Sequence, residues 1–163
     1  MKNNLLVSLF LTVILTFNVY AAGSSDSDSS KNKTQYDKAV SHIKAAKKFE
    51  KKNKLEKAKQ RYEKAQKLLI KSNEKFPNKA DTLNYLGFTT RKLGDFEKGE
   101  KYYLQGLAID PNHKGINEYL GELYVTTGRH NLAVERLGVL KNCDCKEYED
   151  LKAIIAGEKV SKY

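Results

Sequence analysis

The sequence predicts an all-α fold of antiparallel helix pairs, mainly because its features recur 34 residues apart. The recurring features are a Tyr-Leu-Gly motif, a glycine and a proline, at Tyr85-Leu86-Gly87 and Tyr119-Leu120-Gly121, Gly94 and Gly128, and Pro77 and Pro111. This period is typical of a repeated helix–turn–helix unit. Such units stack into solenoids, so the pattern favours a binding surface over a catalytic cleft.

The first 21 residues have the layout of a secretory signal peptide. Lys2 gives a positive start, and the apolar run 5–17 is shorter than the roughly 20 residues that a membrane helix needs. Small or neutral residues precede a predicted cleavage site after Ala21. We therefore expect export to the periplasm, with secretion or an uncleaved N-terminal anchor as the alternatives.

Residues 22–35 are predicted to be a flexible Ser/Asp/Lys linker, and residues 36–163 the folded domain. Five serines alternate with Asp26 and Asp28 between positions 23 and 33. This composition leaves almost no apolar surface to bury.

The first predicted unit, residues 39–79, contains an insertion. When Asn53 is set against the two turn glycines, Pro77 falls seven residues late. Because seven residues are nearly two helical turns, the inserted stretch keeps the same face inward. The pattern predicts one long helix over Lys54–Lys75, roughly 33 Å in length at 1.5 Å per residue.

The middle unit, residues 80–113, has clear boundaries for two helices. Gly94 suits a helix C-terminus because glycine adopts the left-handed conformation without steric cost, and Asp95 is a good N-cap for the next helix. Asp110-Pro111-Asn112 then turns the chain. The expected inward positions are Leu83, Leu86, Gly87, Phe96, Gly99, Tyr103 and Gly106.

The third unit, residues 114–145, repeats this plan. Leu120, Gly121, Tyr124, Ala133, Leu137 and Leu140 stand at the corresponding inward positions, and Gly128 is the turn glycine. We expect the small residues to let helix backbones approach closely, while larger neighbours fill the space beside them. The small residues are Gly87 and Gly121 on the first helices and Gly99 and Ala133 on the second, with Tyr103 and Leu137 beside them.

A capping helix is predicted over residues 146–160, where Tyr148, Leu151, Ile154 and Ile155 follow helical spacing. Solenoids need a closing helix with one polar face. The prediction is therefore three units and a cap, which meets the usual minimum for a stable array.

These positions resemble the tetratricopeptide repeat family. The matching residues are Leu86-Gly87, Gly94, Tyr103 and Pro111 in one unit, and Leu120-Gly121, Tyr124, Gly128, Ala133 and Leu137 in the other. The departures are Leu83 and Asn117 where Trp is common, Thr90 in place of an aromatic residue, and Cys145 in place of Pro. The resemblance, to an exported bacterial type, implies a right-handed superhelical solenoid.

The net charge of +10 lies mostly in the first unit. Residues 31–80 carry 17 Lys or Arg against 5 Asp or Glu, whereas residues 81–163 carry 12 against 13. A basic half attracts anionic surfaces or polymers. Only 4 of the 30 basic residues are Arg, however, which favours a solvated lysine face over specific anion recognition.

The residue pattern does not predict catalysis. The three histidines, His42, His113 and His130, fall on separate elements, and no paired carboxylates, phosphate loop or metal-binding helix motif is present. We expect no catalytic residue, no metal, no cofactor and no small-molecule substrate or nucleic acid as partner.

Cys143-Asp144-Cys145 allows three interpretations. Two cysteines outside the cytosol suggest a local disulfide, although a ring this small would be strained and more reducible. The alternatives are two thiols, unpaired or paired between molecules, and an incomplete soft-metal site.

The family resemblance implies that the first helix of each unit lines a concave binding face. By position, the contact residues are Asn84, Tyr85, Phe88, Arg91 and Lys92, then Glu118, Tyr119 and Glu122, with Ile43, Lys44 and Lys47 in the first unit. Exposed aromatic residues with charged neighbours suit recognition. The alternative is that Tyr85 and Tyr119 only pack between units. The Lys, Asn and Arg set of the family's carboxylate clamp is not reproduced.

The predicted function is therefore a non-catalytic periplasmic or secreted module that binds a protein or peptide. One alternative is that the lysine-rich first unit binds an anionic envelope component, such as lipid headgroups or a charged polymer. Another is an oligomeric assembly scaffold.

Overall fold

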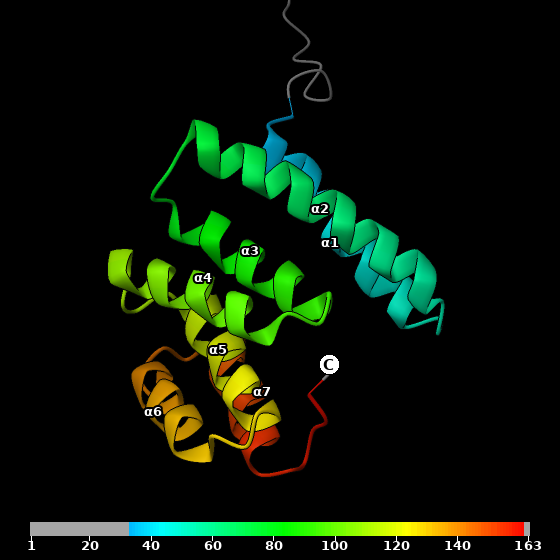
Figure 1. The fold of residues 1–163 in the computed structure, drawn as a ribbon. Helices are drawn as coiled ribbons and strands as arrows, with labels where there is room; N and C mark the ends of the chain where they lie inside the picture. Colours follow the sequence, from blue (N-terminus) through cyan, green and yellow to red (C-terminus); the bar gives the residue numbers. More distant parts are fainter. Residues whose placement is uncertain (1–32, 162–163) are drawn as a thin grey trace, which may run out of the picture.

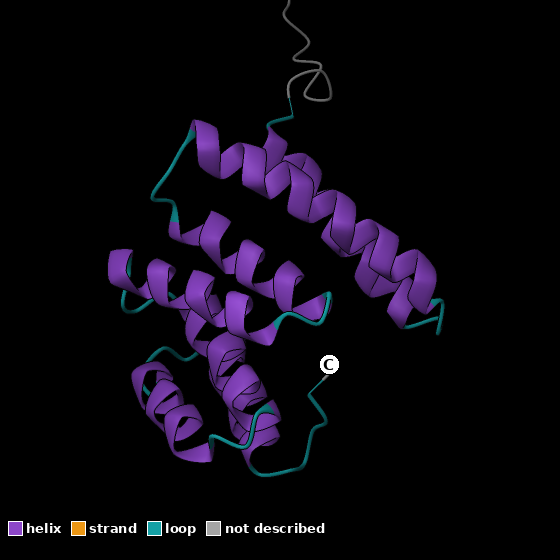
Figure 2. Ribbon diagram, viewed as in Figure 1, coloured by secondary structure: helices purple, strands orange, loops and turns teal. Residues whose placement is uncertain are grey.

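The computed structural model describes residues 33–161, which contain seven helices and no strand (Figure 2). The helices are α1 (Gln35–Glu50), α2 (Leu55–Lys75), α3 (Ala80–Lys92), α4 (Phe96–Ile109), α5 (Lys114–Thr126), α6 (His130–Leu140) and α7 (Lys146–Ile155). The predicted all-α repeat solenoid is confirmed. None of the helices within residues 33–161 is long and apolar enough to cross a membrane.

The predicted signal peptide and most of the predicted linker lie outside the described residues. At the other end of that linker, α1 begins at Gln35, one residue earlier than the predicted domain boundary. Thr34 and Asp37 explain this start, because each side chain accepts a hydrogen bond from the other's backbone N–H at 3.1 Å. This reciprocal capping box fixes the first turn.

The helices pack as three successive pairs, α1 with α2, α3 with α4 and α5 with α6, and α7 closes the stack against α5 and α6 (Figure 1). Each pair turns through a residue with positive φ: Asn53 at 53°, Gly94 at 97° and Gly128 at 75°. These are the three positions that the sequence alignment placed together. The register of the irregular first unit is thus confirmed.

The insertion lengthens α2 to 21 residues, about 32 Å. Lys54 is the N-cap, so the predicted helix is correct to one residue. The buried positions repeat along one face, at Ala58, Tyr62, Ala65, Leu69 and Ser72. With α1 beside it, α2 forms a hairpin whose tip projects beyond α3 and α4 (Figure 1).

Small residues set the helix separations, but not all with the expected neighbours. A Cβ on Gly99 would lie 3.2 Å from the carbonyl oxygen of Gly87, so α3 and α4 meet backbone to backbone as predicted. The Tyr103 ring lies over Gly87. The space at Gly121 is filled instead by Leu151 of α7, at 2.5 Å from a hypothetical Cβ. Gly121 is therefore the position on α5 against which the capping helix α7 packs.

The capping helix is shorter than predicted, because α7 ends at Ile155 and not near residue 160. Gly157 has a φ of 73°, and the N–H of Glu158 bonds the carbonyl of Ala153 at 2.9 Å, which terminates the helix. The segment that follows turns back along the stack toward the α3–α4 turn (Figure 1).

Candidate binding groove

A groove of about 720 Å³ runs across the first helix of every pair and the capping helix. Lys47, Glu50 and Lys51 come from α1 and its C-cap, Leu55 from α2, and Phe88 and Lys92 from α3. The rest of the lining is Glu118, Tyr119 and Glu122 of α5, Lys146, Glu147, Asp150 and Ile154 of α7, and Lys159 and Val160 of the C-terminal segment. Aromatic, aliphatic and charged side chains therefore converge on one surface. We call this surface the groove.

Five of the eight predicted contact residues line the groove: Phe88, Lys92, Glu118, Tyr119 and Glu122. Asn84 and Tyr85 instead line an adjoining hollow of about 560 Å³. Glu118 and Tyr119 belong to both spaces, so the hollow continues the groove toward the α4–α5 turn.

Arg91 does not line the groove. Its side chain is buried, with Nη1 donating to the Tyr119 carbonyl at 2.6 Å and Nη2 pairing with Glu122 Oε2 at 3.2 Å. Its guanidinium also lies 5.8 Å from the Tyr103 ring centroid. Arg91 thus joins α3 to α5 and holds successive repeats together, which helical periodicity within one repeat does not reveal.

The expected exposure of aromatic side chains does not hold at Phe88, which is 3% exposed. Its ring packs between Tyr62, with centroids 5.7 Å apart, and Tyr119, at 5.0 Å. Tyr119 is half-buried, and so is Tyr85, whose ring lies 5.9 Å from that of Tyr36. The tyrosines therefore pack between units while keeping part of their surface in the groove or hollow.

Lys47 is the residue of the first unit that enters the groove. Its ammonium donates to the Tyr119 hydroxyl at 3.2 Å and lies 4.5 Å from the Phe88 ring centroid. Burial lowers its pKa. The two other predicted positions in that unit do not contribute, because Ile43 is buried in the core and Lys44 is exposed outside the groove lining.

The charged residues of α7 were not predicted as part of the site, since the sequence indicated only a closing role for this helix. Asp150 bonds Lys146 within α7 and Lys159 beyond it, the latter at 2.7 Å. Burial would raise the pKa of Asp150, but the hydrogen bonds from both lysines outweigh it and hold that pKa below its usual range. This ion-pair network ties the C-terminal segment to the groove wall.

Glu118 has the most perturbed carboxylate in the groove. Burial raises its pKa to about 8, and the neighbouring negative charges of Glu122, Asp150 and Glu147 add to this effect. A carboxyl group with this pKa is largely protonated at neutral pH.

Residues 80–113 match the family model described as the tetratricopeptide repeat. This part of the chain is a tetratricopeptide repeat. The match covers α3, α4 and the turn after them, which is the repeat that the sequence identified most clearly. No curated protein matches the chain. Tetratricopeptide repeats generally serve as interaction modules, and the groove lies on the helices that line such modules' binding face.

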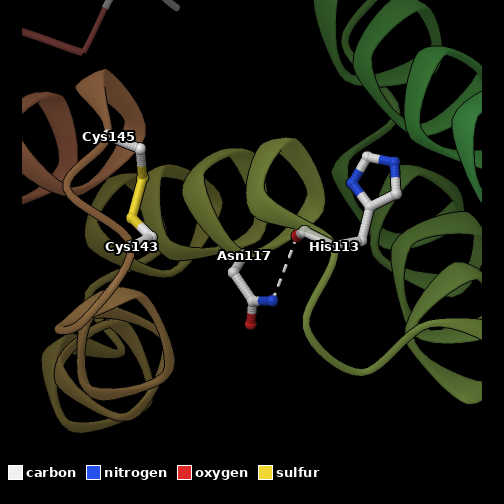
Figure 3. The surroundings of a disulfide bond; sticks show 4 residues. All are labelled: His113, Asn117, Cys143 and Cys145. Carbon is white, nitrogen blue, oxygen red and sulfur yellow. Dashed lines mark hydrogen bonds between the residues drawn. A yellow bond between two sulfur atoms is a disulfide. The ribbon is translucent and has the colours of Figure 1, made fainter.

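After the third helix pair, Cys143 and Cys145 are joined by a disulfide between α6 and α7 (Figure 3). Their Cα atoms lie 5.1 Å apart, and Cys145 is the N-cap residue of α7. The bond constrains the turn before the capping helix. Within residues 33–161, no three His, Cys, Asp or Glu side chains are grouped to hold a metal ion.

The other sequence departures from the repeat pattern also have structural roles. Asn117, in place of Trp, is fully buried and donates through Nδ2 to the carbonyls of His113 at 3.1 Å and Pro111 at 3.0 Å (Figure 3). Thr90 accepts a hydrogen bond from Gln66 at 2.8 Å. Polar contacts therefore stand at both positions, at the α4–α5 turn for Asn117 and between α2 and α3 for Thr90.

Proposed function

We propose that this protein is a non-catalytic module that holds a protein or peptide partner in its groove. The observation that supports the proposal is the convergence of half-buried Tyr119, exposed Leu55 and charged side chains along one surface that crosses all repeats. Aromatic anchors with a polar rim favour polypeptide recognition. The family assignment favours the same role.

Export is part of this proposal. The signal-peptide layout of residues 1–21 and the Cys143–Cys145 disulfide support it, because disulfides persist mainly in oxidising compartments. Periplasmic location with cleavage after Ala21 predicts a mature chain that begins at Ala22. Mass spectrometry of the protein isolated from its host tests this, and an intact Met1 would contradict cleavage.

Co-purification of the partner with two variants tests whether the groove is the binding surface. Leu55→Asp places a charge on a 61% exposed groove residue, and Val134→Asp is the matched control at a 53% exposed residue of α6. We expect Leu55→Asp to lose the co-purified partner and Val134→Asp to keep it, with the helical content of both unchanged. Capture by Leu55→Asp at the parental level would contradict the groove assignment.

A second candidate function is contact with an anionic envelope component through α2. Its lysines are all exposed, and among the described residues none of them forms an ion pair: Lys57, Lys59, Lys64, Lys67, Lys71 and Lys75. Such contacts weaken with salt, because exposed charges are screened over about 8 Å at physiological ionic strength. Capture repeated at low and high salt separates the functions, since groove binding persists and lysine-surface binding is lost.

A further inference from the structure

Glu118 is a buried carboxylate in the groove wall, and the positive charges of Lys47 and Lys146 act on it without forming an ion pair. The residue is 9% exposed, and its carboxylate has no hydrogen-bond or ion-pair partner among the residues that the structure describes. It lines both the groove and the adjoining hollow. Burying an unpaired carboxylate is costly, so this position favours a ligand that supplies the missing partner.

Most of the cations around Glu118 are already engaged with other groups. Arg91 pairs with Glu122 at 3.2 Å, Lys92 pairs with Glu50 at 2.5 Å, and Asp150 receives both Lys146 and Lys159. Lys47 donates to the Tyr119 hydroxyl. Glu147, half-buried on α7, adds a second carboxylate that no described cation pairs. The space next to Glu118 therefore attracts positive charge and repels a carboxylate.

The surroundings favour an organic cation over a metal ion. Within the described part of the chain, the acidic side chains are not grouped closely enough to ligate a metal. Tyr119, next to Glu118 on α5, offers a half-buried ring to the same space. A ring beside a desolvated carboxylate suits a side chain with an alkyl stem and a cationic head.

We propose, on the basis of the proposed function, that the groove receives a lysine or arginine side chain of its polypeptide partner. The cationic head lies at Glu118 and the alkyl stem against Tyr119. A bound cation stabilises the ionised carboxylate. Because the pKa of Glu118 in the empty groove is raised to about 8, binding at neutral pH releases a proton and affinity rises with pH up to that value. The charged or titratable groups that act on Glu118 electrostatically are Lys47, Tyr103, Tyr119, Glu122, Lys146, Glu147 and Asp150. The hollow beside it is also lined by Asp81, Tyr85, Asp110, His113 and Lys114.

Nuclear magnetic resonance titration of the full chain tests this directly. The probes are N-acetyl-lysine-N-methylamide, its arginine analogue and the uncharged norleucine analogue, with alaninamide, which has a free α-amino group, to represent a peptide amino terminus. We expect the lysine or arginine probe to give saturable shifts around Glu118 below about 0.1 M, and the norleucine probe to give none. Tighter binding of alaninamide than of both side-chain probes would overturn the side-chain assignment in favour of an amino terminus.

Glu118→Gln removes the charge at constant shape, and Glu97→Gln is the control at an exposed carboxylate of α4 outside the groove. We expect Glu118→Gln to weaken the lysine or arginine probe about tenfold or more and to abolish proton release, while Glu97→Gln changes neither. Equal binding by Glu118→Gln, or no saturable shift from any cationic probe, would overturn the proposal.

Glu118→Gln also distinguishes a failure of the cation site at Glu118 from a failure of the groove assignment. If Leu55→Asp abolishes partner capture while Glu118→Gln captures at the parental level, only the cation pocket is wrong. If Leu55→Asp also captures normally, the groove itself is not the binding surface.

Discussion

Because Gly87 has no Cβ, the Tyr103 ring of α4 can pack directly against the backbone of α3. A Cβ there would lie 2.5 Å from the ring of Tyr103, which is fully buried. We expect Gly87→Ala to lower the free energy of unfolding by ~1–3 kcal/mol, measured by urea denaturation.

Gly138→Ala is the matched control for this substitution. Gly138 also lies within a helix, α6, but a Cβ there meets nothing within 4 Å. Removing a helical glycine should therefore raise stability by up to about 1 kcal/mol. Equal effects of the two alanines would contradict the close approach at Gly87.

Glu118 lowers the free energy of unfolding as pH rises, which is the opposite of the effect of a carboxylate whose pKa is lowered by folding. Its pKa rises from 4.5 in a solvated chain to about 8 in the fold, because of burial and then its acidic neighbours. The folded state therefore binds more protons than the unfolded state between these values. Its stabilising contribution is complete below about pH 4.5 and is lost as pH rises toward about 8.

Glu118→Gln removes this titration. Urea unfolding at several pH values should show the parent losing stability relative to the variant across that window, by at most about 1.4 kcal/mol per pH unit for one group. A difference between parent and variant that does not change with pH would mean that Glu118 titrates normally.

At the scale of elements, Asn53 decides whether the first helix pair closes like the other two. Its φ of 53° is left-handed, as in Gly94 and Gly128. Asn53→Gly should be neutral or slightly stabilising, whereas Asn53→Ala should cost about 1 kcal/mol of unfolding free energy. Thermal and urea unfolding of both variants measure this, and an alanine variant as stable as the glycine variant would refute the shared turn.

The docking of α7 depends more on its apolar face than on the disulfide. Leu151 is fully buried over Gly121, so Leu151→Ala should cost roughly 2–5 kcal/mol. Replacing Cys143 and Cys145 with serine opens a very short loop and should cost only about 1–2 kcal/mol. Urea unfolding of the variants, with hydrogen exchange in α7, tests this order, and a larger loss from the cysteine pair would reverse it.

Residues whose chemistry is local could be predicted from the sequence. The turn at Gly94, the Asp95 cap and the alignment of Asn53 each depend on backbone conformation within a few residues, and the structure has all three. The length of α2 followed from the seven-residue offset of Pro77 for the same reason.

Features that depend on a neighbouring repeat could not be predicted in this way. The family resemblance placed Phe88 and Arg91 on the binding face, but both are buried. Tyr62 of α2 and Tyr119 of α5 pack against Phe88, and Arg91 binds Tyr119 and Glu122 of α5. The role of Asp150 and Lys159 in the groove wall depends on how α7 docks, which no pattern within α7 specifies. The sequence therefore predicted the helices and their order better than the groove's exposed surface.

At the scale of the whole molecule, the central claim is that the groove across all repeats is the surface that binds the partner. Site-specific photo-cross-linking in intact cells tests it most directly. The photoreactive residue is placed at Leu55 of α2 and Lys146 of α7, which line the groove, and at Leu104 and Val134, which do not line it and are 48% and 53% exposed. We predict that both groove positions capture the same polypeptide and that the other two do not. Capture from Leu104 or Val134 alone, or from no groove position, would contradict the claim.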